Sequence, residues 1–128
     1  MKKNKKFSIK DRIRSFKFAF EGLAHFFKTE HNAWIHLVAT AVVITLGLVF
    51  NVSTHEWLWL SLAIALVFIS EIFNSAIERS VDLSTTEINP IAKQAKDLSA
   101  GATLVAAIFA LIVGLTVFIP HLVDYFGT

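Results

Sequence analysis

Two long uncharged stretches constrain the fold of this chain most strongly. One lies between Glu30 and Glu56, and the other runs from Leu98 to Ile119. A helix needs about 20 apolar residues to cross a bilayer, and both stretches reach that length. The chain has 128 residues, of which 55% are hydrophobic, and a soluble domain this small could not bury so much apolar surface. We therefore expect a single all-α membrane domain over residues 1–128.

A third apolar stretch is interrupted in an informative place. From Trp57 to Ser70 there are only 14 residues before Glu71, too few to span a bilayer at about 1.5 Å per residue. The helix must therefore continue through Glu71 and Asn74. Ionisable groups at the edge of the hydrocarbon are costly and usually functional. We predict three transmembrane helices, the second with an acidic cytoplasmic end, over residues 31–51, 56–83 and 92–122.

Residues 1–29 form a basic N-terminus with an amphipathic pattern. Apolar residues recur there at helical spacings, while the other faces are charged. Such a helix suits the plane of a membrane surface. We expect no cleaved signal peptide, because no short apolar core follows the lysines, and no nucleic-acid partner, because no compact polar domain shapes a basic surface. The apolar stripe consists of Ile9, Ile13, Phe16, Phe20, Leu23 and Phe27.

Lysine and arginine are unevenly distributed between the predicted loops. Nine of the twelve lie between Lys2 and Lys28, and the other three lie between Arg79 and Lys96. Positive charge favours the cytoplasmic side, so we expect a multi-pass protein of the bacterial inner membrane whose N-terminus and second loop face the cytoplasm. The prominent polar residues share that face: Glu30, Glu71, Asn74, Glu78, Asp82, Lys96 and Asp97.

Small residues recur at every fourth position of the third predicted span. Small side chains on one stripe let helix backbones approach closely in lipid. We interpret the stripe as a packing face, within or between subunits. Because three short spans enclose little interior, we also expect a homo-oligomer. The stripe consists of Ala102, Ala106, Ala110 and Gly114.

The acidic end of the second span favours a metal and phosphate site. Glu71, Asn74, Glu78 and Asp82 lie within an arc of roughly 80° on one helical face. Carboxylates this close repel one another unless a cation joins them, and oxygen ligands favour Mg²⁺ shared with substrate phosphates. Lys96 is the obvious cation for a phosphate tail. The sequence contains no glycine-rich phosphate loop of Walker type.

Two sequence runs resemble the prokaryotic diacylglycerol kinase family, which includes undecaprenol kinases. One is Glu71-Ile-Phe-Asn-Ser-Ala-Ile-Glu-Arg-Ser-Val-Asp82, and the other is Ala95-Lys-Asp-Leu-Ser-Ala-Gly-Ala102. The similarity covers nearly the whole chain, including the Glu-Gly-Leu run from Glu21 to Leu23. The resemblance implies a homotrimer that transfers the γ-phosphate of Mg-ATP to the hydroxyl of a membrane lipid, undecaprenol or diacylglycerol.

The resemblance also implies roles for individual residues. Glu71 looks like the general base, and Glu30 and Glu78 look like ligands of Mg²⁺. The remaining site residues fall into two groups. Nucleotide or phosphate contacts are expected at Phe18, Asn74, Asp82, Glu87, Asn89, Lys96 and Asp97. Lipid contacts are expected at Glu71, Asn32, Trp34 and Ser99.

Two positions depart from the family's pattern, and two other functions compete with the kinase. Trp34 stands where many relatives carry Arg, and Asn89 stands where His is expected before Pro90. The run from Glu30 to His36 looks closer to the undecaprenol kinase branch. A small proton or cation transporter could use Glu71 and Glu78, but it should place an acid near the membrane centre. A non-catalytic assembly protein would leave the acidic face unexplained.

Overall fold

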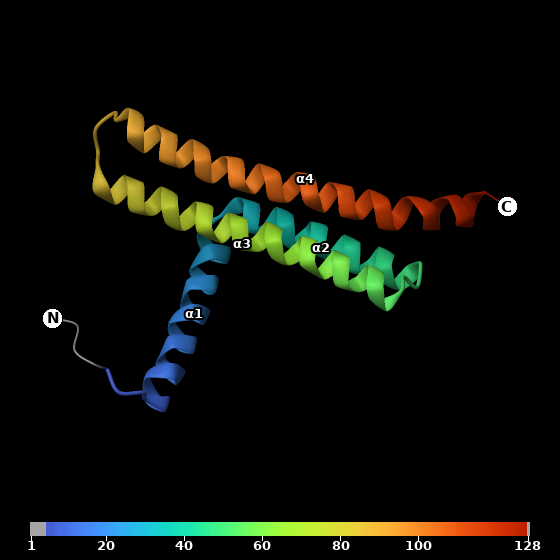
Figure 1. Cartoon of the computed structure of the whole chain (residues 1–128), viewed down its shortest axis with the longest axis horizontal. Coiled ribbons are helices and arrows are strands. Elements are labelled where there is room, and N and C mark those ends of the chain that lie inside the picture. The colour runs from blue at the N-terminus through green and yellow to red at the C-terminus, as the bar shows by residue number, and fades with distance from the viewer. Residues whose placement is uncertain (1–4, 128) are drawn as a thin grey trace.

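The computed structural model describes residues 5–127, and in this range the chain folds into four helices (Figure 1). They are α1 (Ile9–Thr29), α2 (His31–Val49), α3 (Thr54–Ser84) and α4 (Pro90–Phe126). The all-α prediction with three spans is confirmed, since α2, α3 and α4 are each long and apolar enough to cross a membrane. The lysines at positions 2 and 3 lie outside the described residues.

Polar residues at the helix ends define the bounds. The Ser8 side chain caps α1 by accepting a hydrogen bond from the Asp11 backbone amide. Ser53 and Glu56 form a reciprocal capping box at the start of α3. The third span is longer than predicted, because Asn89 caps a helix that begins at Pro90 and continues past Pro120.

Helices α3 and α4 lie side by side and antiparallel, with α2 packed against α3, while α1 projects sideways from the bundle (Figure 1). Helices α3 and α4 contain 31 and 37 residues, which correspond to about 46 and 56 Å at 1.5 Å per residue. Both exceed a hydrocarbon core of about 30 Å. The prediction that the second span continues through Glu71 and Asn74 is confirmed, because both residues lie well inside α3.

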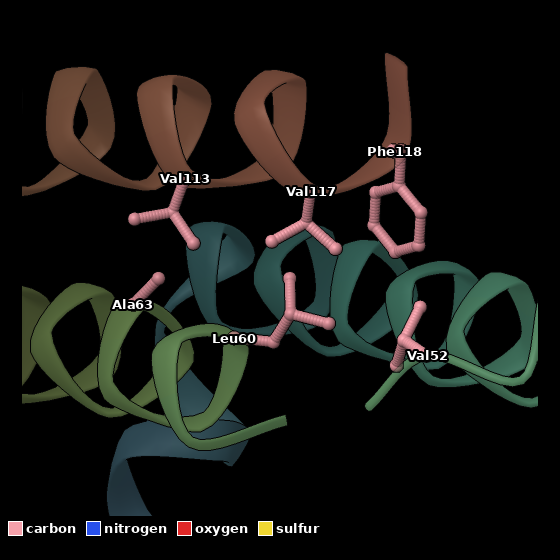
Figure 2. Packing of buried hydrophobic residues seen from close by; sticks show 6 residues of the cluster. All are labelled: Val52, Leu60, Ala63, Val113, Val117 and Phe118. Atoms are coloured by element: carbon pink, nitrogen blue, oxygen red, sulfur yellow. The ribbon is translucent and has the colours of Figure 1, made fainter. Parts of the chain in front are cut away.

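The main apolar core lies between α3 and α4, away from the loop that joins them. Figure 2 shows the α4 side chains pointing toward those of α3 and the α2–α3 turn. This contact holds the two long helices together near their far ends. The buried cluster consists of Val52, Leu60, Ala63, Val113, Val117 and Phe118.

A polar contact closes the same end of the bundle. His121 Nε2 lies 3.1 Å from Oε1 and from Oε2 of Glu56. Phe50 stacks on the His121 ring at 6.0 Å. We call this Glu56–His121 contact the far-end clasp. It joins the end of α4 to the start of α3.

Candidate active site

The acidic residue closest to the middle of α3 is paired with a histidine from α2. Glu71 Oε1 lies 3.1 Å from His36 Nε2, and their side chains are only 13% and 23% exposed. This contact joins two helices across 35 positions of sequence. Glu71 is therefore held in one orientation by a group that does not lie on its own helix.

One turn further along α3, two polar contacts leave the helix in different directions. Ser99 Oγ of α4 donates to Asn74 Oδ1 at 2.7 Å. The adjacent Ser75 Oγ donates to Glu30 Oε1, also at 2.7 Å, and Ser75 and Ser99 are both buried. Asn74 therefore faces α4, whereas Ser75 faces the corner between α1 and α2.

Glu30 occupies that corner, where it ends α1 and begins α2. Arg79 of α3 reaches the same place. Its Nη2 donates to Thr29 Oγ1 at 2.9 Å and to Glu30 Oε1 at 3.4 Å. The orientation of α1 relative to the bundle is thus set in part by groups around a predicted metal ligand.

Nearer the α3–α4 loop, the remaining charges form ion pairs. Lys96 Nζ donates to Asp82 Oδ1 at 2.5 Å, and Glu78 is close enough for its charge to act on the Lys96 ammonium. Lys93 pairs with Asp97 along one exposed face of α4. Of the α3 carboxylates, Glu71 and Asp82 are thus within hydrogen-bond distance of side chains on neighbouring helices.

These ion pairs border a hollow at the α3–α4 loop, with a volume of about 630 Å³. We call it the loop-end hollow. It lies between the ends of α3 and α4 and carries charges of both signs. Five of the residues predicted to contact nucleotide line it: Asp82, Glu87, Asn89, Lys96 and Asp97.

Other predicted contacts lie outside this hollow. Asn74 is half-buried closer to Glu71, and Phe18 is 58% exposed on α1. Of the predicted lipid contacts, Asn32 is exposed, and Trp34 Nε1 donates to the Phe27 carbonyl at 2.7 Å. Asn89 already accepts two backbone hydrogen bonds as the cap of α4.

Glu30 and Glu78, the predicted metal ligands, offer carboxylate oxygens, which suit Mg²⁺ better than a transition metal. Within residues 5–127, no group of three or more His, Cys, Asp or Glu is placed to hold a metal ion. Mg²⁺ commonly binds one or two carboxylates and completes its shell with waters and phosphate oxygens. Both hydrogen bonds made to the Glu30 carboxylate use Oε1, so Oε2 remains for a ligand.

Sequence reasoning missed three residues that the fold brings to this site, namely His36, Ser75 and Arg79. His36 lies 35 positions from Glu71 and on another helix, so spacing along the sequence does not connect the two. The available signal was weak. His36 lies six residues after Glu30 in a largely apolar stretch, so it lies near the same end of the bundle.

The chain is similar in sequence to known proteins. The model of the family described as prokaryotic diacylglycerol kinase matches residues 17–118. A Bacillus subtilis (strain 168) protein named undecaprenol kinase is 39% identical over 110 residues, which cover 86% of this chain and 89% of the relative. A Synechocystis protein named diacylglycerol kinase is 38% identical over 86% of this chain and 63% of its own length. A Helicobacter pylori protein, also named diacylglycerol kinase, is 33% identical over 80% of this chain and 86% of its own length.

Proposed function

Because the chain belongs to the prokaryotic diacylglycerol kinase family, we propose that this lipid kinase transfers the γ-phosphate of ATP to a membrane lipid hydroxyl. The observation that carries the proposal is the line of polar groups along α3. It leads from the half-buried Glu71 to the loop-end hollow lined by Lys96 and Asp82. In this arrangement the base Glu71 lies toward the bilayer, where the lipid would be, and the phosphate contacts lie toward water, where the nucleotide would be.

In this proposal Glu71 accepts the proton of the lipid hydroxyl as the oxygen attacks the γ-phosphorus. Phosphoryl transfer depends mainly on positioning and charge neutralisation, and a positioned base makes the weak hydroxyl nucleophile reactive. Glu30 and Glu78 would hold Mg²⁺, which when bound neutralises charge on the β- and γ-phosphates. Lys96 contributes a further positive charge near the phosphate tail.

We propose undecaprenol or diacylglycerol as the acceptor, and undecaprenol is favoured slightly by the run from Glu30 to His36. The products would be undecaprenyl phosphate or phosphatidic acid. We further propose a homotrimer in the bacterial inner membrane, with the N-terminus and the α3–α4 loop in the cytoplasm. The distribution of Lys and Arg supports this orientation.

The test is transfer of radiolabelled phosphate from ATP by the purified full chain, with diacylglycerol and undecaprenol offered side by side. Glu71→Gln should reduce transfer at least 100-fold, the scale of general base catalysis, with unchanged helix content and elution volume. Asp124→Asn serves as the matched control, because Asp124 is exposed at the other end of the bundle. Normal transfer by Glu71→Gln would remove the base assignment, and no transfer to either lipid would overturn the proposed function.

A further inference from the structure

We propose that His36 is a positioning residue for the reaction, which holds the Glu71 carboxylate in the orientation that accepts the lipid proton. This inference rests on the proposed function and deepens it at the same site. An ionised carboxylate only accepts hydrogen bonds. A carboxylate that accepts the lipid proton is ionised, so in this arrangement His36 Nε2, 3.1 Å from Glu71 Oε1, donates the hydrogen.

The His36 ring is held by its surroundings. The edge of Phe68, on α3, packs against it at 6.2 Å and 70°. Phe68 in turn lies 6.1 Å from Phe27 near the end of α1. Aromatic contacts of this kind favour particular ring orientations. The imidazole is thus packed between its own helix and α3, so its hydrogen bond constrains the carboxylate.

The contact selects which carboxylate oxygen reacts. Because Oε1 accepts the His36 hydrogen, Oε2 remains to face the substrate hydroxyl. The lipid O–H proton passes to Oε2 as the lipid oxygen forms its bond to the γ-phosphorus. The bond from the γ-phosphorus to the β-phosphate oxygen breaks, and its electron pair leaves with ADP. His36 keeps its own proton throughout, so it orients the base and does not replace it.

The place of His36 in the fold fits this role. It lines one end of a groove of about 290 Å³ between α2, α3 and α4, whose other lining residues are nearly all apolar. The loop-end hollow lies in the opposite direction along α3. The His36–Glu71 pair therefore lies between the apolar groove and the polar residues of α3 that extend to the loop-end hollow.

The experiment compares His36→Leu with His36→Gln in the purified full chain. His36→Leu removes the donor, and we expect kcat to fall roughly ten- to a hundredfold, as for loss of a hydrogen bond to a charged group. The KM for ATP should not change, because the loop-end hollow is untouched. His36→Gln should recover most of kcat, since its amide can donate in place of Nε2. His55→Gln is the control, because His55 is exposed at the opposite end of α3.

A second measurement separates positioning from a general structural role. Glu71→Asp shortens the side chain and withdraws the carboxylate from Nε2, so adding His36→Leu should then cost less than about threefold, as expected for coupled residues. Unchanged kcat in His36→Leu, equal losses in the Leu and Gln variants, or additive losses would each overturn the inference. If the unaltered chain transfers phosphate and Glu71→Gln does so equally well, the proposed base is overturned instead. If His36→Leu does not fold, the kcat and KM of His36→Gln decide.

Discussion

At the scale of single residues, three of the site's carboxylates have separate partners. Glu71 has His36, Asp82 has Lys96, and Glu30 has Ser75 and Arg79. The exposed Lys96–Asp82 ion pair contributes little to stability. The value of these contacts lies in holding oxygen atoms in place for substrates. Glu78 is different, because it is half-buried near Lys96 and is therefore the acid best placed to gain from a divalent cation.

Glu78→Gln should raise the magnesium concentration needed for half-maximal phosphate transfer at least tenfold, or abolish activity. The amide keeps the size of the side chain but loses the charge that Mg²⁺ prefers. The measurement is the initial rate against magnesium concentration at fixed ATP, with Asp124→Asn as control. A magnesium dependence identical to that of the unaltered chain would contradict the ligand role.

The acidic face of the site could be predicted from sequence, but its partners could not. A helix fixes the directions of its own side chains, so Glu71 and Glu78 could be placed on one face from spacing alone. The contacts of Glu71 with His36 and of Ser75 with Glu30 join residues 35 and 45 positions apart. Such contacts depend on how helices cross and rotate about their axes, which local periodicity does not determine.

At the scale of helices, the turn between α2 and α3 depends on two special positions. Asn51 has a φ of 48°, in the left-handed region that asparagine tolerates better than most residues. Gly47 lies against the Trp57 ring so closely that an added Cβ would overlap it. The third predicted span, 92–122, already ran past Pro120, and the helix α4 begins two residues earlier and ends four residues later than predicted.

Gly47→Ala should therefore destabilise the packing of α2 on α3 by about 1–3 kcal/mol, the usual cost of overpacking. The measurement is thermal unfolding in detergent, followed by helix content. Gly114→Ala is the matched control, because a Cβ there meets nothing within 4 Å. Replacing Trp57 with the smaller phenylalanine in the Gly47→Ala variant should recover part of the lost stability. Equal stability of the two alanine variants would show that the close approach is not required.

At the scale of the whole molecule, α3 and α4 are each longer than the hydrocarbon core of a bilayer, and the polar groups of the site lie toward the ends that the α3–α4 loop joins. The small-residue stripe of α4 contributes to this arrangement within one chain, because Ala106 is buried and Ala110 packs against the core. Ala102 is exposed at the same stripe. The stripe is therefore a packing face inside the subunit over part of its length, and the proposed trimer would have to use other surface as well.

The proposed orientation can be mapped with single cysteines, because the sequence contains none. A membrane-impermeant maleimide should label Thr54→Cys in intact spheroplasts, since Thr54 would face the periplasm. Thr86→Cys, in the α3–α4 loop, should be labelled only after the membrane is opened. Both residues are exposed. The reverse labelling pattern would place the site outside the cell, away from cytosolic ATP, and would contradict the proposed orientation.

The far-end clasp has a mechanical consequence for the hollow at the opposite end. Glu56 and His121 join α3 to α4 far from the loop, so a relative tilt of the two helices that keeps this contact is largest at the loop end. The lever arm from His121 to Lys96 is about 37 Å at 1.5 Å per residue, and a tilt of only about 5° would shift Lys96 by about 3 Å. The spacing between the side chains predicted to contact phosphate thus depends on a contact at the opposite end of the bundle.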